Sequence, residues 1–364
     1  MSTPLLICDD SNMARKQVAR SLPDGWDVDI SFATNGFEAV DAIKAGKGDV
    51  LLLDLNMPEM DGYQVLEAIK SQDLPTMVIV ISGDIQPEAH KRVTALGALD
   101  FIKKPVSKEK LTEILSSYGI FAVEKEEPIR QKVVQPEQEE VKLRALTKAP
   151  EKAISVNPNK KSAIESLPDE IRDCYQEIAN VAMGRAGDLL ARILDVFVML
   201  PIPNVNLIEV SELSMALSAI ESHESTSGIC QGFIGAGISG EALLILNDSS
   251  FKDVASLMNY QYEVDESTEL ELLMDLANLL IGACLSGISE QLDMSFSQGH
   301  PVVLGQHRKI SELIATNATK WKRTLAIEIS YSIENYPIKC DLLFLFTEDS
   351  MKTLNNKISY LIDE

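Results

Sequence analysis

The chain has 364 residues, 45% of them hydrophobic and 24% charged, a composition typical of a globular protein with two or three cores. Its formal net charge of −22 disfavours binding to nucleic acids and to anionic membranes, whose phosphates carry the same sign of charge. Basic residues form no cluster that would offset this charge, because Lys103-Lys104 and Lys160-Lys161 are isolated pairs. The composition therefore makes a nucleic-acid-binding protein a poor candidate.

The cysteines and the apolar segments indicate a cytoplasmic protein without a membrane span. The five cysteines lie far apart and form no CxxC pair, which is typical of free thiols in a reducing compartment. The N-terminal segment has no basic residues ahead of its apolar run, so we expect no signal peptide. The most apolar stretch, residues 272–288, contains Asp275 and Asn278, which favours a buried amphipathic helix.

Residues 1–121 alternate short apolar runs with amphipathic segments. The apolar runs 5–8, 50–53 and 77–81 each end at a polar residue. Continuous apolar strands separated by helical patterns predict a doubly wound α/β domain, in which helices cover both faces of a parallel sheet. Functional side chains of such a sheet gather at the C-terminal ends of its strands.

Five polar residues at the predicted strand ends suit one chemical purpose: Asp9, Asp10, Asp54, Ser82 and Lys104. The three carboxylates offer the hard oxygen ligands that Mg²⁺ prefers. Asp54 is also a candidate carboxylate nucleophile for phosphoryl transfer. Lys104 would neutralise phosphoryl oxygens as charge develops, and Ser82 would donate a hydrogen bond to them.

These residues lie in stretches that resemble response-regulator receiver domains of the CheY type. The matching stretches are Cys8-Asp9-Asp10-Ser11, Leu53-Asp54-Leu55-Asn56-Met57-Pro58, Ile81-Ser82-Gly83-Asp84 and Lys103-Lys104-Pro105. The resemblance implies a five-stranded parallel sheet, phosphorylation of Asp54 by a histidine kinase, and Mg²⁺ bound by Asp9, Asp10 and Asp54. It also implies phosphoryl binding by Ser82 and Lys104, and an aromatic switch at Phe101. Asn56 and Asp84 occupy positions that tune the lifetime of the phosphoryl group in this family.

Residues 122–164 have the composition of a linker. Sixteen of these 43 residues are charged, four are proline, and none is aromatic or glycine. Such a segment cannot bury enough apolar surface to fold alone. We therefore predict a flexible connection that lets the flanking domains touch or separate.

Residues 165–364 carry a polar pattern that occurs twice, at a separation of 98 residues. The first polar set is Asp173-xxx-Glu177-xx-Asn180, and the second polar set is Glu271-xxx-Asp275-xx-Asn278. Side chains at positions i, i+4 and i+7 share one face of an α-helix. The sequence thus predicts two similar helices, each with carboxylates and an amide on one stripe.

Further features repeat with the two sets. A proline follows each set at the same spacing, Pro203 in the first copy and Pro301 in the second. Gly184 and Gly282 extend the two stripes by one turn, and a glycine leaves room for another backbone to approach. Strand-rich sequence follows each helix, so we predict an α+β domain with an internal pseudo-two-fold repeat.

The first polar set and Pro203 resemble the motif of the CheC/CheX/FliY family of chemotaxis phosphatases. The resemblance implies hydrolysis of the phospho-aspartate on a CheY-like protein. Glu177 would pair with the active-site lysine of the target, and Asn180 would orient a water toward the phosphorus. A neutral amide can do this without adding negative charge near the phosphoryl group. In the second polar set Asp275 replaces the glutamate and is one methylene shorter, while Asn278 is kept, so this site is either weaker or a degenerate duplicate.

Three functions remain open at this point. The first is a phospho-aspartyl phosphatase that acts on a separate chemotaxis regulator and is gated when its own receiver, switched at Asp54, covers the Glu177 and Asn180 face. The second is a binding module that is switched by phosphorylation but catalyses nothing. The third is a phosphatase that acts on phospho-Asp54 of the same or a neighbouring chain. A CheD-like partner, known for some members of the family, is a further expectation, whereas a DNA-binding output is not expected because the output half is acidic.

Overall fold

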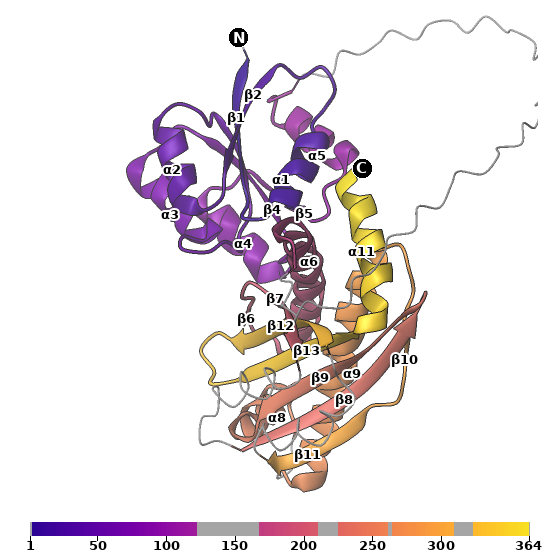
Figure 1. The fold of residues 1–364 in the computed structure, drawn as a ribbon. Coiled ribbons are helices and arrows are strands. Elements are labelled where there is room, and N and C mark those ends of the chain that lie inside the picture. Colours follow the sequence, from indigo (N-terminus) through magenta and orange to yellow (C-terminus); the bar gives the residue numbers. More distant parts are fainter. Residues whose placement is uncertain (1, 122–166, 210–224, 261–263, 309–322, 364) are drawn as a thin grey trace, which may run out of the picture.

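The computed structural model describes residues 2–121, 167–209, 225–260, 264–308 and 323–363, and all structural statements concern these residues (Figure 1). They form an N-terminal α/β domain and a C-terminal α+β domain. The predicted linker, residues 122–164, lies outside the described residues. Figure 1 shows the two domains in contact, with one long helix between them.

The N-terminal domain contains five strands and five helices in alternation. Their bounds are β1 Thr3–Cys8, α1 Asn12–Arg20, β2 Val28–Ala33, α2 Gly36–Lys44, β3 Val50–Leu53, α3 Gly62–Gln72, β4 Met77–Ser82, α4 Pro87–Leu96, β5 Asp100–Lys103 and α5 Lys108–Ser117. The strand order is β2-β1-β3-β4-β5, and every neighbouring pair is parallel. The predicted five-stranded parallel sheet is confirmed.

Local sequence explains these elements. All four residues of β3 are buried, as expected for a central strand that helices cover on both faces. The side chains of Ser11, Asn35 and Asp61 accept hydrogen bonds from the first turns of α1, α2 and α3. Each cap fixes where a helix begins after a strand end, and so fixes the loops that carry the polar residues.

The C-terminal domain is an antiparallel sheet with long helices on one face. Its elements are α6 Asp169–Leu194, β6 Val198–Met199, β7 Asn204–Glu209, β8 Thr226–Gly235, β9 Ile238–Asn247, η1 Asp248–Ser250, α8 Phe251–Leu257, α9 Glu266–Gln291, β10 Ser297–Gln298, β11 Val302–Arg308, β12 Arg323–Ile333, β13 Lys339–Thr347 and α11 Glu348–Asp363. The strand order is β10-β8-β9-β13-β12-β6, with β11 also paired to β8 and β7 to β12. The same succession of short strands, a long hairpin and a helix therefore follows both α6 and α9.

Helices α6 and α9 pack against each other and against the sheet. A Cβ atom on Gly287 would lie 2.8 Å from the Cα atom of Ala182, so small residues set this close approach. The core they form includes Tyr175, Leu280 and Phe344. Helix α9 is long and apolar enough to cross a membrane, but 56% of its most apolar window is buried inside the domain. This agrees with the predicted buried helix.

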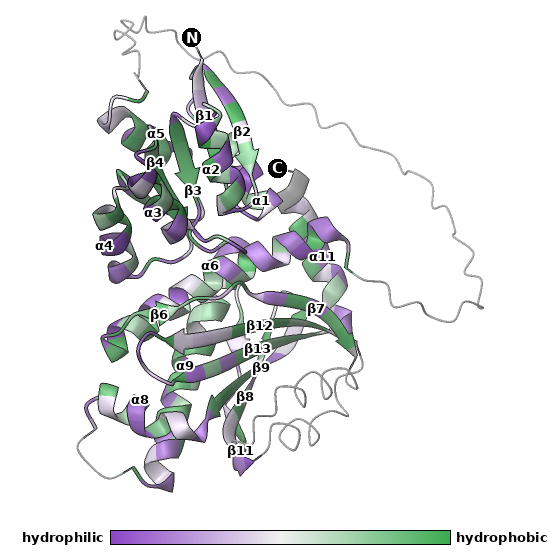
Figure 2. Cartoon of the chain, turned by 90° about the vertical axis from the view of Figure 1, so that its left-hand side faces the viewer, coloured by the Kyte–Doolittle hydropathy of each residue, from purple (hydrophilic) through white to green (hydrophobic). Residues whose placement is uncertain are grey.

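Helix α6 lies between the two domains and contacts both of them (Figure 2). Tyr175, Ile178 and Ala182 belong to the core of the C-terminal domain. Glu177 and Asn180 lie on the side that faces the N-terminal domain, and both are buried, at 5% and 6% exposure. The first polar set is thus covered by the N-terminal domain of the same chain.

Candidate functional site

The C-terminal ends of the parallel strands bring four of the predicted polar residues together, and the fifth, Asp10, belongs to the same cluster of acids. Asp9 follows β1, Asp54 follows β3, Ser82 ends β4, and Lys104 follows β5. The Lys104 Nζ atom lies 2.8 Å from Asp9 Oδ2 and 3.5 Å from Asp54 Oδ1. All four side chains are buried. The Lys104–Pro105 peptide bond is cis.

Asp9, Asp10 and Asp54 fit a divalent cation. Each offers a carboxylate oxygen, and the three oxygens lie within 4.8 Å of one another. Both carboxylate oxygens of Asp54 are buried and have no hydrogen-bond partner among the described residues. Buried carboxylates without donors are costly unless a cation or another group compensates them. Three oxygen ligands of this kind suit Mg²⁺.

Burial and nearby charges shift the pKa values of Asp54 and Asp10. Burial raises the pKa of Asp54 well above its usual value, and the positive charge of Lys104 opposes that rise. Burial and the nearby Asp9 carboxylate raise the pKa of Asp10 to about 6. Burial alone would lower the pKa of Lys104, but the surrounding carboxylates, led by Asp54, raise it instead. The lysine therefore stays charged and holds the acids together.

Helix α6 adds a fourth carboxylate to this site. Glu177 Oε1 lies 3.2 Å from Lys104 Nζ, and both side chains are almost fully buried. Burial raises the pKa of Glu177 to about 7, while Lys104 lowers it and Asp9 raises it. Glu177 and Lys104 thus form an ion pair between the two domains of the same chain.

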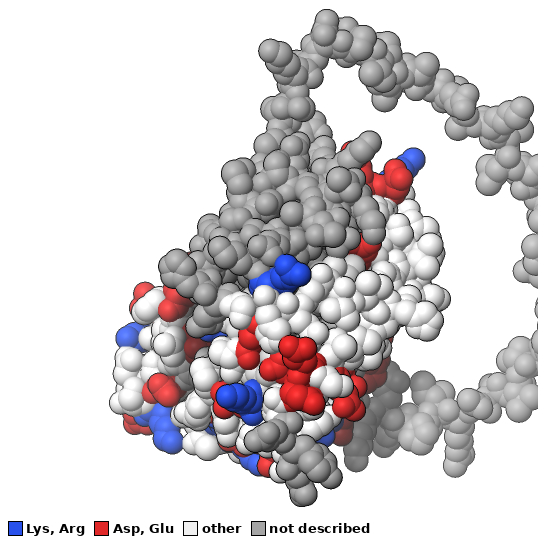
Figure 3. Space-filling view, turned by 90° about the horizontal axis from the view of Figure 1, so that it is seen from below, with Lys and Arg blue, Asp and Glu red and all other residues white. Residues whose placement is uncertain are grey.

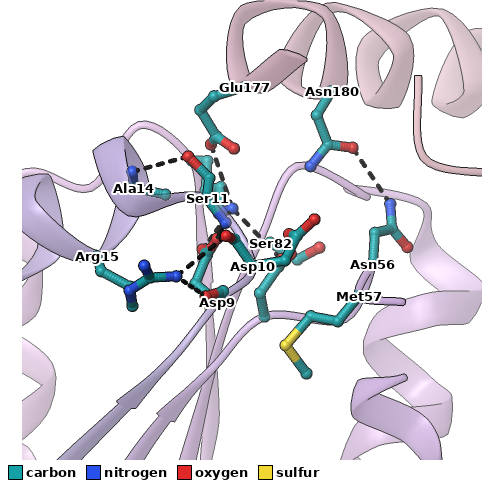
Figure 4. A network of polar contacts seen from close by, with 12 residues as sticks. Asp9, Asp10, Ser11, Ala14, Arg15, Asn56, Met57, Ser82, Glu177 and Asn180 are labelled. Atoms are coloured by element: carbon teal, nitrogen blue, oxygen red, sulfur yellow. Dashed lines mark hydrogen bonds and ion pairs between the residues drawn. The ribbon is translucent and has the colours of Figure 1, made fainter. Parts of the chain in front are cut away.

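Asn180 reaches the same site one helical turn further along α6. Figure 4 shows Glu177 and Asn180 pointing from α6 toward the strand ends of the N-terminal domain. The Asn56 Nδ2 atom lies 3.5 Å from Asn180 Oδ1, which is a long hydrogen bond. The amide of Asn180 therefore lies beside the position that tunes phosphoryl lifetime in the resembling family.

Asp173, the first member of the first polar set, contacts the backbone of α1. Its carboxylate accepts hydrogen bonds from the backbone N–H groups of Asn12 and Met13, at 3.2 and 2.8 Å. These groups are the free donors at the positive end of α1. Asp173 therefore fixes the start of α1 against α6, a role that its spacing alone did not indicate.

Gly184 allows the two backbones to touch. A Cβ atom on Gly184 would overlap the carbonyl oxygen of Gly83. The predicted close approach of another backbone is confirmed at this position. At Gly282, the counterpart on α9, a Cβ atom would meet only the Gln298 side chain, at 3.8 Å.

The second polar set lies on an exposed side of α9. The side chains of Glu271, Asp275 and Asn278 are exposed. The two sets therefore differ in their surroundings, because the N-terminal domain covers only the first.

The remaining predicted switch residues, Ser82 and Phe101, lie in the same domain as the Asp9, Asp10 and Asp54 cluster. Ser82 is fully buried, and its Oγ atom accepts a hydrogen bond from the Asp84 backbone N–H at 3.2 Å. Phe101 is partly buried, and its ring meets the His90 ring edge-on with centroids 5.7 Å apart. The aromatic ring thus packs against α4, next to the loop that Ser82 begins.

Sequence reasoning missed a second contact between the domains. It involves Gln86 and Arg92 on the N-terminal side, and Val198 and Glu334 on the C-terminal side. No motif marks these residues, which lie up to 242 positions apart in the chain. A salt bridge or an amide pair over such a distance has no periodic signal in the sequence.

The end of the C-terminal domain opposite the N-terminal domain carries one group of acidic side chains on a mostly uncharged face. Figure 3 shows Asp and Glu side chains gathered there in one group, with Lys and Arg side chains more scattered. This surface would repel nucleic-acid phosphates.

Comparisons with known proteins concern mainly the N-terminal domain. Residues 5–116 match the family of the response regulator receiver domain. Protein-glutamate methylesterase/protein-glutamine glutaminase 3 of Geobacter sulfurreducens is 39% identical over 112 residues, which cover 30% of this chain and 30% of that protein. The probable C4-dicarboxylate response regulator DctR of Priestia megaterium is 33% identical over 123 residues, 33% of this chain and 53% of that protein. The similarity thus spans from about a third to about half of these relatives.

Several solved structures are similar to part of the chain. The match to Thermotoga maritima FliY covers 54% of this chain and 98% of the FliY chain, with a TM-score of 0.40 and 19% identity. The receiver domain of NarL from Mycobacterium tuberculosis covers 32% of this chain and 95% of its own, with a TM-score of 0.30 and 33% identity. The match to a chain of the CheX-CheY-BeF3-Mg complex from Borrelia burgdorferi covers 31% of this chain and 87% of that chain, with a TM-score of 0.30 and 32% identity. From the family match and the site geometry together, residues 5–116 are a response regulator receiver domain.

Proposed function

We propose that the C-terminal domain hydrolyses the phosphorylated aspartate of a CheY-like receiver domain, and that the first polar set carries this reaction. One observation supports it above all. Glu177 pairs with the active-site lysine of a receiver, Lys104, while Asn180 lies at the same phospho-acceptor site. This is the pairing that the resemblance to the CheC/CheX/FliY family implies. We assign the chain to two-component signalling, with chemotaxis as the setting that the resemblance suggests.

The reaction is the hydrolysis of an acyl phosphate. Water attacks the phosphorus in line with the bond to the Asp54 carboxylate oxygen. A new P–O bond forms from the water, the bond to Asp54 breaks, and its electron pair returns to the carboxylate. The products are inorganic phosphate, a proton and free Asp54. Bound Mg²⁺ would be held by Asp9, Asp10 and Asp54 and would supply positive charge to the phosphoryl oxygens.

Asn180 is the residue we propose to position the water. Its amide can accept a hydrogen bond from the water and donate another to a phosphoryl oxygen, and it adds no charge to a site that already holds several carboxylates. A base is not required if the transition state is loose, because the attacking water keeps its protons until late. Asn180 is 6% exposed, so bulk water has little access to compete at this point.

Glu177 is a docking residue in this proposal. Its carboxylate is paired with the Lys104 ammonium group at 3.2 Å, so in this proposal the side chain holds the two domains together and does not contact the attacking water. The pair fixes the distance between α6 and the phospho-acceptor site. The catalytic contribution of Glu177 therefore comes through the placement of Asn180.

The second polar set is a weaker site in this proposal. The strand order supports a duplicated domain, because β8, β9, β13 and β12 form the centre of the sheet and the short strands lie at both edges. Asp275 and Asn278 are exposed in the described arrangement and so are free to meet a separate receiver. The shorter Asp275 side chain reaches a lysine less well than Glu177 does.

A binding module without catalysis is the second candidate function. It is favoured by the burial of Glu177 and Asn180 against the N-terminal domain, a contact that binding alone would produce. In that case phosphorylation would only switch the contact between the domains. The CheD-like partner stays a prediction.

The test measures the release of phosphate from Mg²⁺-loaded receivers phosphorylated at aspartate, both as the full chain charged at Asp54 and as a separate CheY-type receiver. Wild type is compared with Glu177→Ala/Asn180→Ala and with Glu271→Ala/Asn278→Ala. The proposal predicts accelerated release that is lost in the first double variant and largely kept in the second. Equal release in all three proteins, with the domains still in contact, would leave the binding module as the function.

A further inference from the structure

We infer that the first polar set is built to receive the chain's own receiver domain, and that a second contact surface selects this occupant. We call this surface the α4 latch. It consists of Gln86 and Arg92 of the receiver domain, and of Phe197, Val198 and Glu334 of the C-terminal domain. The inference deepens the proposed function by naming its partner, and only its consequence for hydrolysis rests on that function.

Most contacts along this stripe of α6 give little choice among receivers. Glu177 pairs with Lys104, a residue of the phosphorylation machinery. Asp173 binds backbone N–H groups, and Gly184 approaches a backbone carbonyl. Any receiver with the same machinery offers these groups. The contact between Asn180 and Asn56 adds one side chain outside the machinery, but at 3.5 Å it is long, so selection requires further side chains elsewhere.

Gln86 forms one half of the α4 latch. Its Nε2 atom donates to the Val198 carbonyl at 2.8 Å, and its Oε1 atom accepts from the Val198 N–H at 2.9 Å. The side-chain amide thus pairs with both backbone groups of one residue, as a neighbouring strand would. Gln86 is 1% exposed, so a receiver with an apolar side chain here would leave both Val198 groups buried without partners.

The receiver domain holds Gln86 ready for this contact. Asp84 Oδ1 accepts hydrogen bonds from the backbone N–H of Gln86 and from its Nε2 atom, at 3.1 and 3.0 Å. Asp84 in turn donates its own N–H to Ser82 Oγ. A fixed side chain loses less conformational entropy on binding, so this relay strengthens the contact. It also joins the α4 latch to the phospho-acceptor site.

Arg92 forms the other half of the α4 latch. Its guanidinium donates two hydrogen bonds to the Glu334 carboxylate, at 3.0 and 2.6 Å, and lies 4.0 Å from the centroid of the Phe197 ring. The Glu334 backbone N–H donates to the Phe197 carbonyl at 3.0 Å, which keeps the two partners of Arg92 together. A two-pronged pair stacked on a ring is specific for arginine in both shape and charge.

Charge exchange between Arg92 and Glu334 tests the inference in the full chain. The variants are Arg92→Glu, Glu334→Arg and the double exchange, with Lys91→Glu as the control, because the Lys91 side chain is 73% exposed and pairs with Glu88 on its own helix. Docking is measured by amide hydrogen exchange at Asn12 and Met13, which Asp173 protects. The loss of phosphate from charged Asp54 is measured in parallel.

Arg92→Glu and Glu334→Arg should each speed amide hydrogen exchange at Asn12 and Met13 about tenfold. The double variant should restore protection of these amides to within about threefold of wild type. Lys91→Glu should leave it unchanged. If the single variants behave like Lys91→Glu, or if the double variant gives no recovery, the inference is wrong. If docking follows this pattern but phosphate loss does not, the α4 latch stands and the proposed hydrolysis fails.

Discussion

Glu177 on α6 and Lys104 after β5 form an ion pair across the two domains, with Oε1 and Nζ 3.2 Å apart. The same lysine lies 2.8 Å from Asp9 and 3.5 Å from Asp54. The Lys104 ammonium group thus lies close to carboxylates from three separate parts of the chain: Asp9 after β1, Asp54 after β3 and Glu177 on α6. The contact between the domains and the arrangement of the clustered acids therefore both involve the Lys104 side chain.

Gly184→Ala should separate the domains. The added methyl group would overlap the carbonyl oxygen of Gly83, and both partners at this contact are backbone, which cannot turn away. Small-angle X-ray scattering of the full chain should show a larger radius of gyration than wild type. Gly282→Ala is the matched control, since only the end of a glutamine side chain lies near that position. An unchanged radius in Gly184→Ala would contradict the described contact.

Asp173→Asn should weaken docking without abolishing it. The amide oxygen can still accept from the Asn12 or Met13 N–H, but the negative charge at the positive end of α1 is lost. The expected cost is about 0.5–1 kcal/mol. Amide exchange at Met13 measures it as a severalfold increase. Glu271→Gln, the equivalent change in the exposed second polar set, should have no effect, and an equal effect of the two changes would argue against the assigned role of Asp173.

Docking without Mg²⁺ should weaken as the pH rises. Burial raises the pKa of Glu177 to about 7 in the docked state, against 4.5 for a free glutamate. The docked state thus binds a proton more readily than the separated state does. The stabilisation of the docked state by this proton is fully present below pH 4.5 and is lost as the pH rises through about 7. For one proton, the ratio of docked to separated protein falls by at most about tenfold per pH unit.

Scattering at pH 5.5 and pH 8 in a chelator checks this dependence. Wild type should be more compact at the lower pH. Glu177→Gln removes the titrating group while keeping a polar side chain of similar size, so its compactness should depend less on pH. If the compactness of Glu177→Gln depends on pH as strongly as that of wild type, the titration belongs to other groups. Asp10 and Asp84 are then the candidates, because burial raises the pKa of each to about 6.

Mg²⁺ should bind to the receiver domain through its three carboxylates. Asp54→Asn removes one of them together with the phosphorylation site, and should weaken Mg²⁺ binding as measured by titration calorimetry. Asp61→Asn is a suitable control, because Asp61 caps α3 and is not one of the three clustered acids. Equal Mg²⁺ affinities of wild type and Asp54→Asn would remove Asp54 from the ligand set.

Much of the site was predictable from the sequence because its signals are local. Apolar strands that end in Asp9, Asp54 and Ser82 place those residues at one edge of a parallel sheet. The spacing of Glu177 and Asn180 places them on one helical face, and both do face a phospho-acceptor site. These inferences need only the periods of a strand and a helix.

The contact between the domains was predictable only in outline. Coverage of the Glu177 and Asn180 face by the attached receiver was one expected state. The partners of Arg92 and Gln86 were not foreseen, because a single arginine or glutamine on a helix resembles any solvated polar residue. Their roles depend on strands β6 and β12, which lie more than 100 residues further along the chain.

The most direct measurement is the rate at which phosphate leaves Asp54 of the full, Mg²⁺-loaded chain, followed at several protein concentrations. Asn180→Ala is compared with wild type and with Asn278→Ala, and amide exchange at Asn12 and Met13 confirms that docking persists. The account predicts a rate that does not change on dilution, falls at least about tenfold in Asn180→Ala, and is nearly unchanged in Asn278→Ala. A docked Asn180→Ala protein that loses phosphate as fast as wild type would contradict it.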